Sequence, residues 1–231
     1  MTTPKRASGF TLIELNLAII FVAMLLLAVI ATTMYASRLY SQGVTLKSIN
    51  QVGREVTDQM RRDISGTSPS KIQVKTLNVA GTDVATRVCL GAVSYVINPA
   101  QYLRDGDPSL VRDAVNEPIS LVRIENDQNS EWCAEGGSGF TRMFVTGSDS
   151  YRELLPQDVI PLAVHSASVS QLAVAATGSS GLTRFMVQLG TNETETIDGG
   201  VCRPPTALEN NFDNCAVREF QTIIRMTGRS T

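Results

Sequence analysis

The stretch GFTLIELNLAIIFVAMLLLAVIATTMYAS, residues 9–37, decides how this chain is built. It carries no charged side chain between Leu15 and Ser37. With a rise of about 1.5 Å per helical residue, the run is long enough to cross a membrane as a helix. A single carboxylate, Glu14, stands at its start. An ionised carboxylate beside so apolar a run is costly unless something pairs with it, so the position of Glu14 predicts a partner.

The residues before the apolar run predict its orientation. Lys5 and Arg6 precede it, and no acidic residue stands before Glu14. Basic residues stay on the cytoplasmic side, so we expect a single-pass membrane protein with a cytoplasmic N-terminus and the larger part of the chain outside. A buried helix of a soluble domain is the alternative, but the run is aliphatic all round rather than along one face.

A short motif stands between the basic residues and the apolar run. A secretory signal peptide is cut after its apolar segment, whereas the junction of Gly9 and Phe10 lies before it. The stretch GFTLIEL, residues 9–15, closely resembles the processing site of type IV prepilins and of the pseudopilins of type II secretion and competence systems. The resemblance implies a leader of residues 1–9, cleavage after Gly9, and methylation of the new amino terminus at Phe10.

The same resemblance gives Glu14 its expected partner. In a filament, the carboxylate of Glu14 would meet the N-terminal amine of Phe10 on a neighbouring subunit. Each charge is costly to bury alone and tolerable as a pair, so the pairing would select the register between subunits. The implied partners are other pilin subunits, the prepilin peptidase, the pilus assembly platform in the membrane and, before assembly, the lipid bilayer. After assembly the chain would lie in an extracellular filament.

Beyond residue 37 the pattern becomes that of an amphipathic helix. Apolar residues recur at three- and four-residue steps with charged residues between them. Gly43 and Gly53 weaken such a helix by about 1 kcal/mol each relative to alanine. The stretch SGTSPS, residues 65–70, then ends it, because proline cannot continue a helix. We therefore expect one helix over 10–65. Its later apolar face consists of Leu46, Ile49, Val52, Val56, Met60 and Ile64.

Residues 66–231 show the pattern of a head domain made of short strands. Segments rich in β-branched and aromatic residues alternate with Gly, Asn, Asp and Pro. An antiparallel sheet packed on the amphipathic half of the long helix would cover the apolar side of both, which predicts an α+β fold. The expected strands are KIQVKTLNV (71–79), TRVCLGAVSYVI (86–97), PISLVRIE (118–125), FTRMFVT (140–146), LTRFMVQLG (182–190) and REFQTIIRMT (218–227).

The four cysteines all follow the predicted membrane crossing. An even number on an oxidising side indicates two disulfides, with three connectivities open. We favour Cys202 with Cys215 and Cys89 with Cys133. The first pair encloses a polar loop, residues 203–214, that resembles the C-terminal disulfide loop of type IV pilins.

Composition gives little support for catalysis or nucleic-acid binding. The chain has 20 Lys and Arg against 22 Asp and Glu, a formal net charge of -2, so no basic field favours nucleic acid. Its one histidine, His165, has no recognisable nucleophile or carboxylate partner in the sequence, and we read it as a packed or surface residue. No CxxC spacing indicates a zinc site. We expect no enzyme, no cofactor and no metal.

The sequence therefore predicts a structural subunit of a type IV pilus or related filament. The stretch GREVTDQMRRDI, residues 53–64, loosely resembles minor pilins and pseudopilins, which favours a minor pilin. The alternatives are a pseudopilin of a type II secretion or competence system, and an uncut membrane-anchored extracellular binding protein. An anchored extracellular enzyme would need a convergent polar site that the sequence does not reveal.

Overall fold

The structure is a computed structural model with two compact units, Met1–Gly43 and Val44–Thr231. The predicted cleavage site at Gly9 and Phe10 lies outside the described residues. The described residues are 11–79, 81–105, 110–113, 115–127, 129–136, 139–146, 149–155, 160–175, 180–192, 197–198, 201–202 and 215–227.

The longest element is α1, Leu12–Ser65, which begins in the first unit and ends in the second. The residues of α1 in the first unit are mostly apolar and almost all exposed. Those from Val44 onward are amphipathic, and Ile49, Val56 and Ile64 are buried as their spacing predicts. The bounds agree with the expected helix to within two residues at its start.

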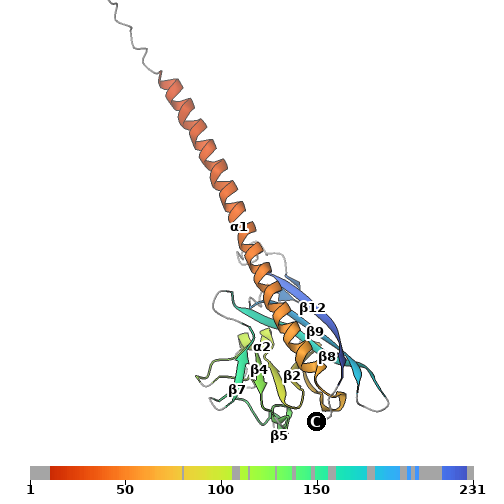
Figure 1. The fold of residues 1–231 in the computed structure, drawn as a ribbon. Coiled ribbons are helices and arrows are strands. Elements are labelled where there is room, and N and C mark those ends of the chain that lie inside the picture. The colour runs from red at the N-terminus through yellow and green to blue at the C-terminus, as the bar shows by residue number, and fades with distance from the viewer. Residues whose placement is uncertain are drawn as a thin grey trace, which may run out of the picture. The chain divides into compact units, whose positions relative to one another are not determined.

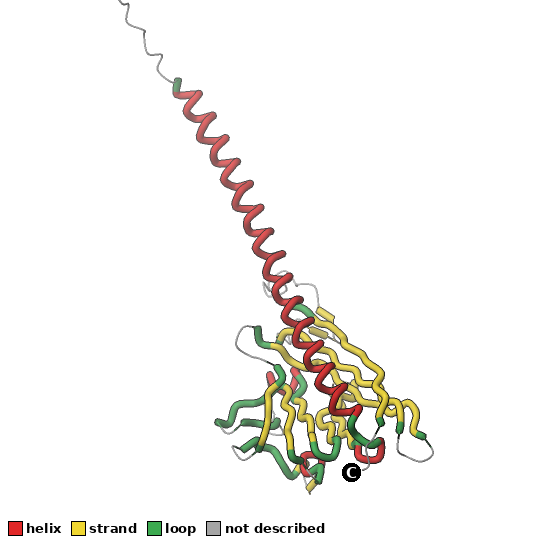
Figure 2. The backbone as a smooth tube through the Cα atoms, viewed as in Figure 1, coloured by secondary structure: helices red, strands yellow, loops and turns green. Residues whose placement is uncertain are grey.

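The remaining elements are mostly short strands, as Figures 1 and 2 show. They follow α1 in the order η1 (Pro69–Lys71), β1 (Gln73–Val79), β2 (Thr82–Cys89), β3 (Val93–Ile97), α2 (Ala100–Asp105), β4 (Leu121–Glu125), η2 (Glu131–Cys133), β5 (Glu135–Gly136), β6 (Gly139–Phe140), β7 (Ser150–Glu153), β8 (Leu162–Val174), β9 (Gly181–Thr191), β10 (Ile197–Asp198), β11 (Val201–Cys202) and β12 (Val217–Met226).

Two larger antiparallel sheets make up the second unit. One has five strands in the order β1-β2-β3-β4-β7, and the other has three in the order β12-β9-β8. A parallel bridge between Pro99 and Val164 links the end of β3 to β8. Strands β5 with β6 and β10 with β11 form two small pairs. The α+β fold predicted from the sequence is confirmed.

One hydrophobic core joins the amphipathic part of α1 to both sheets. Ile49, Met60 and Ile64 lie in it with side chains from β2, β3, β8, β9 and β12. Gly53 is buried in the same helical face, and a Cβ placed there would lie 2.1 Å from Cζ of Phe220 in β12. The helix therefore approaches β12 as closely as a glycine allows.

The five-stranded sheet has buried residues on both faces. Alternate residues of a strand point to opposite faces, and in the central strands both sets are buried. Tyr95 and Leu121 belong to the core shared with α1. Val96, Val122 and Ile124 belong to a second cluster on the opposite face. That second cluster also holds Val111, Ile119, Val145, Trp132 and the disulfide cysteines Cys89 and Cys133.

A polar contact fastens α1 to the five-stranded sheet. Asp63 of α1 accepts hydrogen bonds from Arg123 Nε at 2.6 Å and from the hydroxyl of Tyr95. Gln59, one turn earlier on the helix, donates to the same carboxylate at 3.3 Å. Burial raises the pKa of Asp63, but the hydrogen bonds from Arg123, Tyr95 and Gln59 outweigh it and hold that pKa below its ordinary value.

The segment FTRMFVT, residues 140–146, is not the strand that its composition predicts. Only Phe140 belongs to a named strand, β6, and Phe144 forms an isolated bridge with Arg112. The backbone of Arg112 donates to the Met143 carbonyl and accepts from Val145, so pairing stops after one residue. The segment crosses the second hydrophobic cluster as a loop.

Candidate functional site

The first candidate site is the N-terminal turn of α1, where Glu14 lies. Thr11 precedes the helix, and its hydroxyl accepts a hydrogen bond from the Glu14 backbone N–H at 3.3 Å. The Glu14 carboxylate in turn accepts from the Thr11 backbone N–H at 3.3 Å and from the Thr11 hydroxyl at 3.2 Å. This reciprocal pair is a capping box, which satisfies backbone donors that a helix start leaves unpaired.

The apolar segment after Glu14 exposes its side chains on all sides. Leu12 is 78% exposed and Leu27 is 67% exposed, and none of the most apolar window of α1 is buried. Thr32 and Thr33 satisfy their hydroxyls inside the helix by donating to the carbonyls of Ala28 and Val29, at 3.0 and 2.9 Å. The helix is long and apolar enough to cross a membrane, which is a statement about its length and composition.

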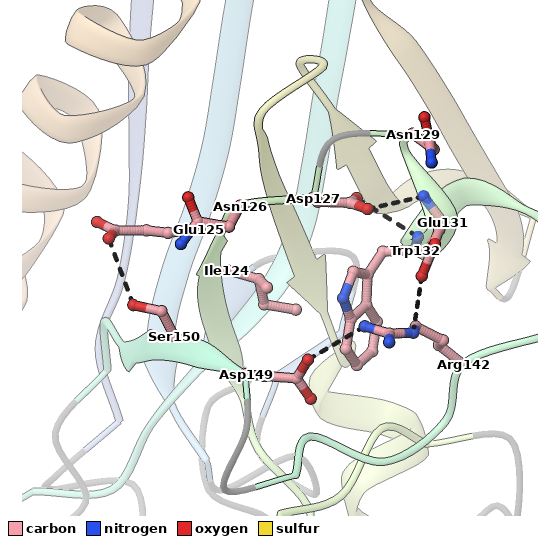
Figure 3. Close-up of a pocket in the computed structure, with 10 residues that line it drawn as sticks. All are labelled: Ile124, Glu125, Asn126, Asp127, Asn129, Glu131, Trp132, Arg142, Asp149 and Ser150. Carbon is pink, nitrogen blue, oxygen red and sulfur yellow. Dashed lines mark hydrogen bonds and ion pairs between the residues drawn. The ribbon is translucent and has the colours of Figure 1, made fainter.

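The second candidate site is a pocket of about 340 Å³ in the second unit, beside the end of β4 (Figure 3). Its wall combines carboxylates, amides, a hydroxyl, one guanidinium and an indole. The lining residues are Ile124, Glu125, Asn126, Asp127, Asn129, Glu131, Trp132, Arg142, Asp149 and Ser150. They come from β4, η2, β7 and the segments between these elements.

The floor of this pocket is built around Asp127. Its carboxylate accepts from the backbone N–H groups of Glu131 at 2.7 Å and Trp132 at 3.4 Å, and from the hydroxyl of Ser94. These bonds hold the start of η2 against β3. The disulfide between Cys89 and Cys133 fixes the other end of η2 to β2.

Arg142 crosses the pocket between two carboxylates, as the dashed lines in Figure 3 show. Its guanidinium lies 3.3 Å from Glu131 Oε2 and 3.1 Å from Asp149 Oδ1. Burial raises the pKa of Asp149, but hydrogen bonds from Thr146 and the charge of Arg142 outweigh it and hold that pKa below its ordinary value.

Trp132 is fully buried, and two guanidinium groups lie close to its indole ring. The Arg142 guanidinium lies 5.5 Å from the indole ring centre, and that of Arg87 lies 5.6 Å from it. In Figure 3 the indole nitrogen lies on the edge of the ring that faces Ile124. Among the described residues, Trp132 Nε1 has no hydrogen-bond partner.

Arg87 lies behind Trp132 and is almost completely buried. Its guanidinium donates to the carbonyls of Trp132 at 2.7 Å and Arg142 at 2.8 Å, and lies 3.8 Å from the ring centre of Phe140. Burial lowers the pKa of Arg87 to about 10. The guanidinium thus braces the back of the pocket wall through backbone carbonyls and aromatic faces.

The other residues singled out in the sequence lie apart from both sites. His165 of β8 donates from Nε2 to the Thr191 carbonyl at 3.0 Å, and burial lowers its pKa. This is the packed residue that its sequence context indicates. The described part of the chain contains no group of three or more His, Cys, Asp or Glu side chains placed to hold a metal ion.

The disulfides have the connectivity that the sequence favours. Cys89 is joined to Cys133, with 6.2 Å between their Cα atoms, and Cys202 is joined to Cys215, with 6.0 Å between theirs. The polar loop enclosed by the second bridge, residues 203–214, lies outside the described residues.

The comparisons with known proteins leave both candidate sites to be interpreted from their own chemistry. The chain matches no family model, no curated protein and no solved structure.

Proposed function

We propose that this chain is a pilin-like subunit that assembles into an extracellular filament through its apolar N-terminal helix. The observation that carries the proposal is the fully exposed apolar segment of α1 with a single carboxylate, Glu14, in its first turn. Its resemblance to the prepilin processing motif, on residues 9–15, supports the same assignment. A minor subunit of a type IV pilus is the role that we favour.

The exposed segment needs an apolar environment outside its own unit. Burying one Leu or Ile side chain is favourable by about 1.5–3 kcal/mol, and this segment leaves a long series of them exposed. A bilayer before assembly and a bundle of identical helices after assembly would both cover these side chains. The bilayer and the helix bundle are equally apolar. The same helix surface can therefore pass from the bilayer into the bundle.

Glu14 distinguishes the two environments. In the isolated chain its carboxylate is held by Thr11 of the same helix. In a filament, the N-terminal amine of Phe10 on a neighbouring subunit would give it a full counter-charge. A buried carboxylate that finds such a partner favours the assembled register over others.

Processing and assembly are tested in two measurements on the same cells. Intact-mass analysis of the membrane protein should show a mature chain that begins at N-methylated Phe10. The sheared surface fraction should contain this mature chain. Gly9→Ala should be cut more readily than Gly9→Leu, because the peptidase must accommodate the side chain at this position.

Two results would contradict the proposal. A chain that still begins at Met1 in cells with active prepilin peptidase would favour the uncut anchored binding protein. A correctly cut chain that never enters a sheared filament, in cells that make filaments, would remove the assembly role. A cut chain found only in a secretion or competence filament would favour a pseudopilin instead of a pilus subunit.

A further inference from the structure

The pocket beside β4 has a combination of groups that filament assembly does not use. Acceptors and donors lie on the same side of β4 as the indole of Trp132 in Figure 3, whereas the side chain of Glu125 points away from them. Glu131 and Asp149 bring carboxylate oxygens, and Arg142 brings guanidinium N–H groups. We propose that this pocket binds a neutral saccharide through its hydroxyl groups. The proposal does not depend on filament assembly.

The charges in the pocket argue against an anionic ligand. Three carboxylates face it, on Asp127, Glu131 and Asp149, against one guanidinium, on Arg142. Both ion pairs of Arg142 are made with those carboxylates. The carboxylate of Glu125 is paired with Arg123 instead. A phosphate or sulfate would meet net negative charge, and its anionic oxygens would be repelled by the carboxylates.

The indole argues against a purely cationic ligand. Trp132 is fully buried, and its Nε1 donor has no partner among the described residues, which is costly unless an acceptor reaches it. An ammonium or guanidinium group offers donors alone. A hydroxyl group offers a donor for the carboxylates and an acceptor for the indole. Among simple ligands, a neutral sugar presents several such hydroxyls within the span of one pocket.

The access route to the indole follows from the position of Arg142. Its guanidinium lies over the indole ring, and its side chain is 42% exposed. A ligand can contact the buried indole nitrogen only if a neighbouring side chain shifts, and the proposal assigns that shift to the long, partly exposed side chain of Arg142. Asp127 and the Cys89–Cys133 bridge hold the floor beneath it, so the site is largely formed before the ligand arrives.

The chain carries its own probe for this site. Trp132 is its one tryptophan, so the intrinsic fluorescence reports on the pocket. Full-length protein in detergent should be titrated with glucose, galactose, mannose, N-acetylglucosamine and their disaccharides. At least one should change the fluorescence in a saturable way at millimolar concentration or below. Arginine and inorganic phosphate, tested in parallel, should not.

Two variants test the geometry by calorimetry. Trp132→Phe keeps an aromatic ring and removes a donor that has no partner, so the head should stay folded while saccharide affinity falls about three- to tenfold. Glu131→Gln removes the charge of a carboxylate that faces Arg142 in the pocket and should weaken binding by a similar factor. Glu219→Gln, at an exposed glutamate of β12 outside the pocket, is the matched control and should bind as the unmodified chain does.

The proposal is wrong if no neutral sugar binds, or if arginine or phosphate binds in preference to every sugar. It is also wrong if Trp132→Phe folds and binds sugar with unchanged affinity, because the indole nitrogen would then face no ligand. Sugar binding that Glu131→Gln and Glu219→Gln weaken equally would place the ligand elsewhere on the head.

Discussion

The two parts of α1 have the same backbone and opposite surroundings. Before Val44 the helix exposes almost every apolar side chain, whereas after it Ile49, Met60 and Ile64 are buried against two sheets. The later part is therefore stabilised by residues of its own chain. In the proposed function, the earlier part would be stabilised by contacts outside the chain, with lipid or with other subunits. Substitutions in the two parts should accordingly be read by different measurements, one of assembly and one of head stability.

The largest effect is expected at Glu14, in the exposed part. We predict that Glu14→Ala leaves membrane insertion and cleavage unchanged, because the apolar run and Gly9 remain. Removing one partner of a buried charge pair costs about 3–5 kcal/mol, so incorporation into filaments should fall more than about a hundredfold. The measurement is the ratio of variant to unmodified subunit in sheared filaments at matched membrane levels.

Glu14→Gln separates charge from shape at the same position. It nearly keeps the size and the hydrogen bonding of the side chain and removes the charge. Incorporation as efficient as that of the unmodified chain, for both Gln and Ala, would show that Glu14 is a spectator and that the pairing across subunits is wrong.

The second effect is expected at Asp63, in the buried part. Asp63→Ala should destabilise the head by about 3 kcal/mol, because it strands the partly buried Arg123 and the hydroxyl of Tyr95. Asp58→Ala, an exposed carboxylate on the same helix, is the control and should change stability by less than about 0.5 kcal/mol. Chemical denaturation followed by the fluorescence of Trp132 measures both. Equal effects of the two substitutions would show that the Asp63 contact contributes nothing.

Asp63 also makes the stability of the head depend on pH, in a direction that follows from the shift of its pKa. Because the folded-state pKa of Asp63 lies below its ordinary value, the ionised form is favoured by folding. That contribution is fully present above the ordinary pKa of about 4 and is lost as the pH falls below it toward the depressed folded-state value. Asp63→Asn should flatten this acid-side loss. A loss on acidification that is as steep in Asp63→Asn as in the unmodified chain would assign it to other groups.

The smallest effect concerns two glycines of α1, one in each part. Gly43→Ala should raise helix stability by up to about 1 kcal/mol, since no atom of a described residue lies within 4 Å of the added Cβ. Gly53→Ala should instead destabilise the head by about 1 kcal/mol or more, because the new Cβ lies 2.1 Å from Phe220 Cζ. We expect opposite signs, with more helix by circular dichroism for Gly43→Ala and lower head stability by chemical denaturation for Gly53→Ala. A stabilising Gly53→Ala would mean that the ring of Phe220 moves aside freely.

The long helix and the fold class could be predicted because their signals are local and repeated. The apolar run, the three- and four-residue spacing and SGTSPS at 65–70 together predicted a helix ending where α1 ends. The capping box at Thr11 and Glu14 is also a local signal, with Thr and Glu three residues apart, and the sequence analysis missed it. It shows that Glu14 has an acceptor role inside its own helix.

Strand β8, by contrast, could not be predicted from its own residues. Its sequence, LAVHSASVSQLAV, is rich in Ala and Ser, which have little preference for strands. It is a strand because β9 pairs with it along most of its length, from Leu162 opposite Thr191 to Val174 opposite Gly181. The segment 140–146 is the reverse case, since among the described residues its strand pairing is limited to Phe140 with Glu135 and Phe144 with Arg112. In both, tertiary pairing overrides local preference.

The pocket was missed for a related reason. Its residues are ordinary turn and loop residues in the sequence, and their convergence depends on η2 being held at one end by Asp127 and at the other by Cys133. Gly53 is similar, because its sequence context predicts only a weak point in a helix. The contact with Phe220 that explains it comes from the other end of the chain.

The Cys89–Cys133 bridge also imposes an order on the maturation of the chain. It closes 44 residues of sequence and ties η2, which carries Trp132, to β2. Its formation needs an oxidant, whereas the apolar part of α1 contains no cysteine and needs none. A chain kept in a reducing compartment would therefore have a finished anchor and an unfinished pocket. If the head is exported and binds a sugar as proposed, it would acquire that recognition only after export, when the chain can no longer meet cytoplasmic sugars.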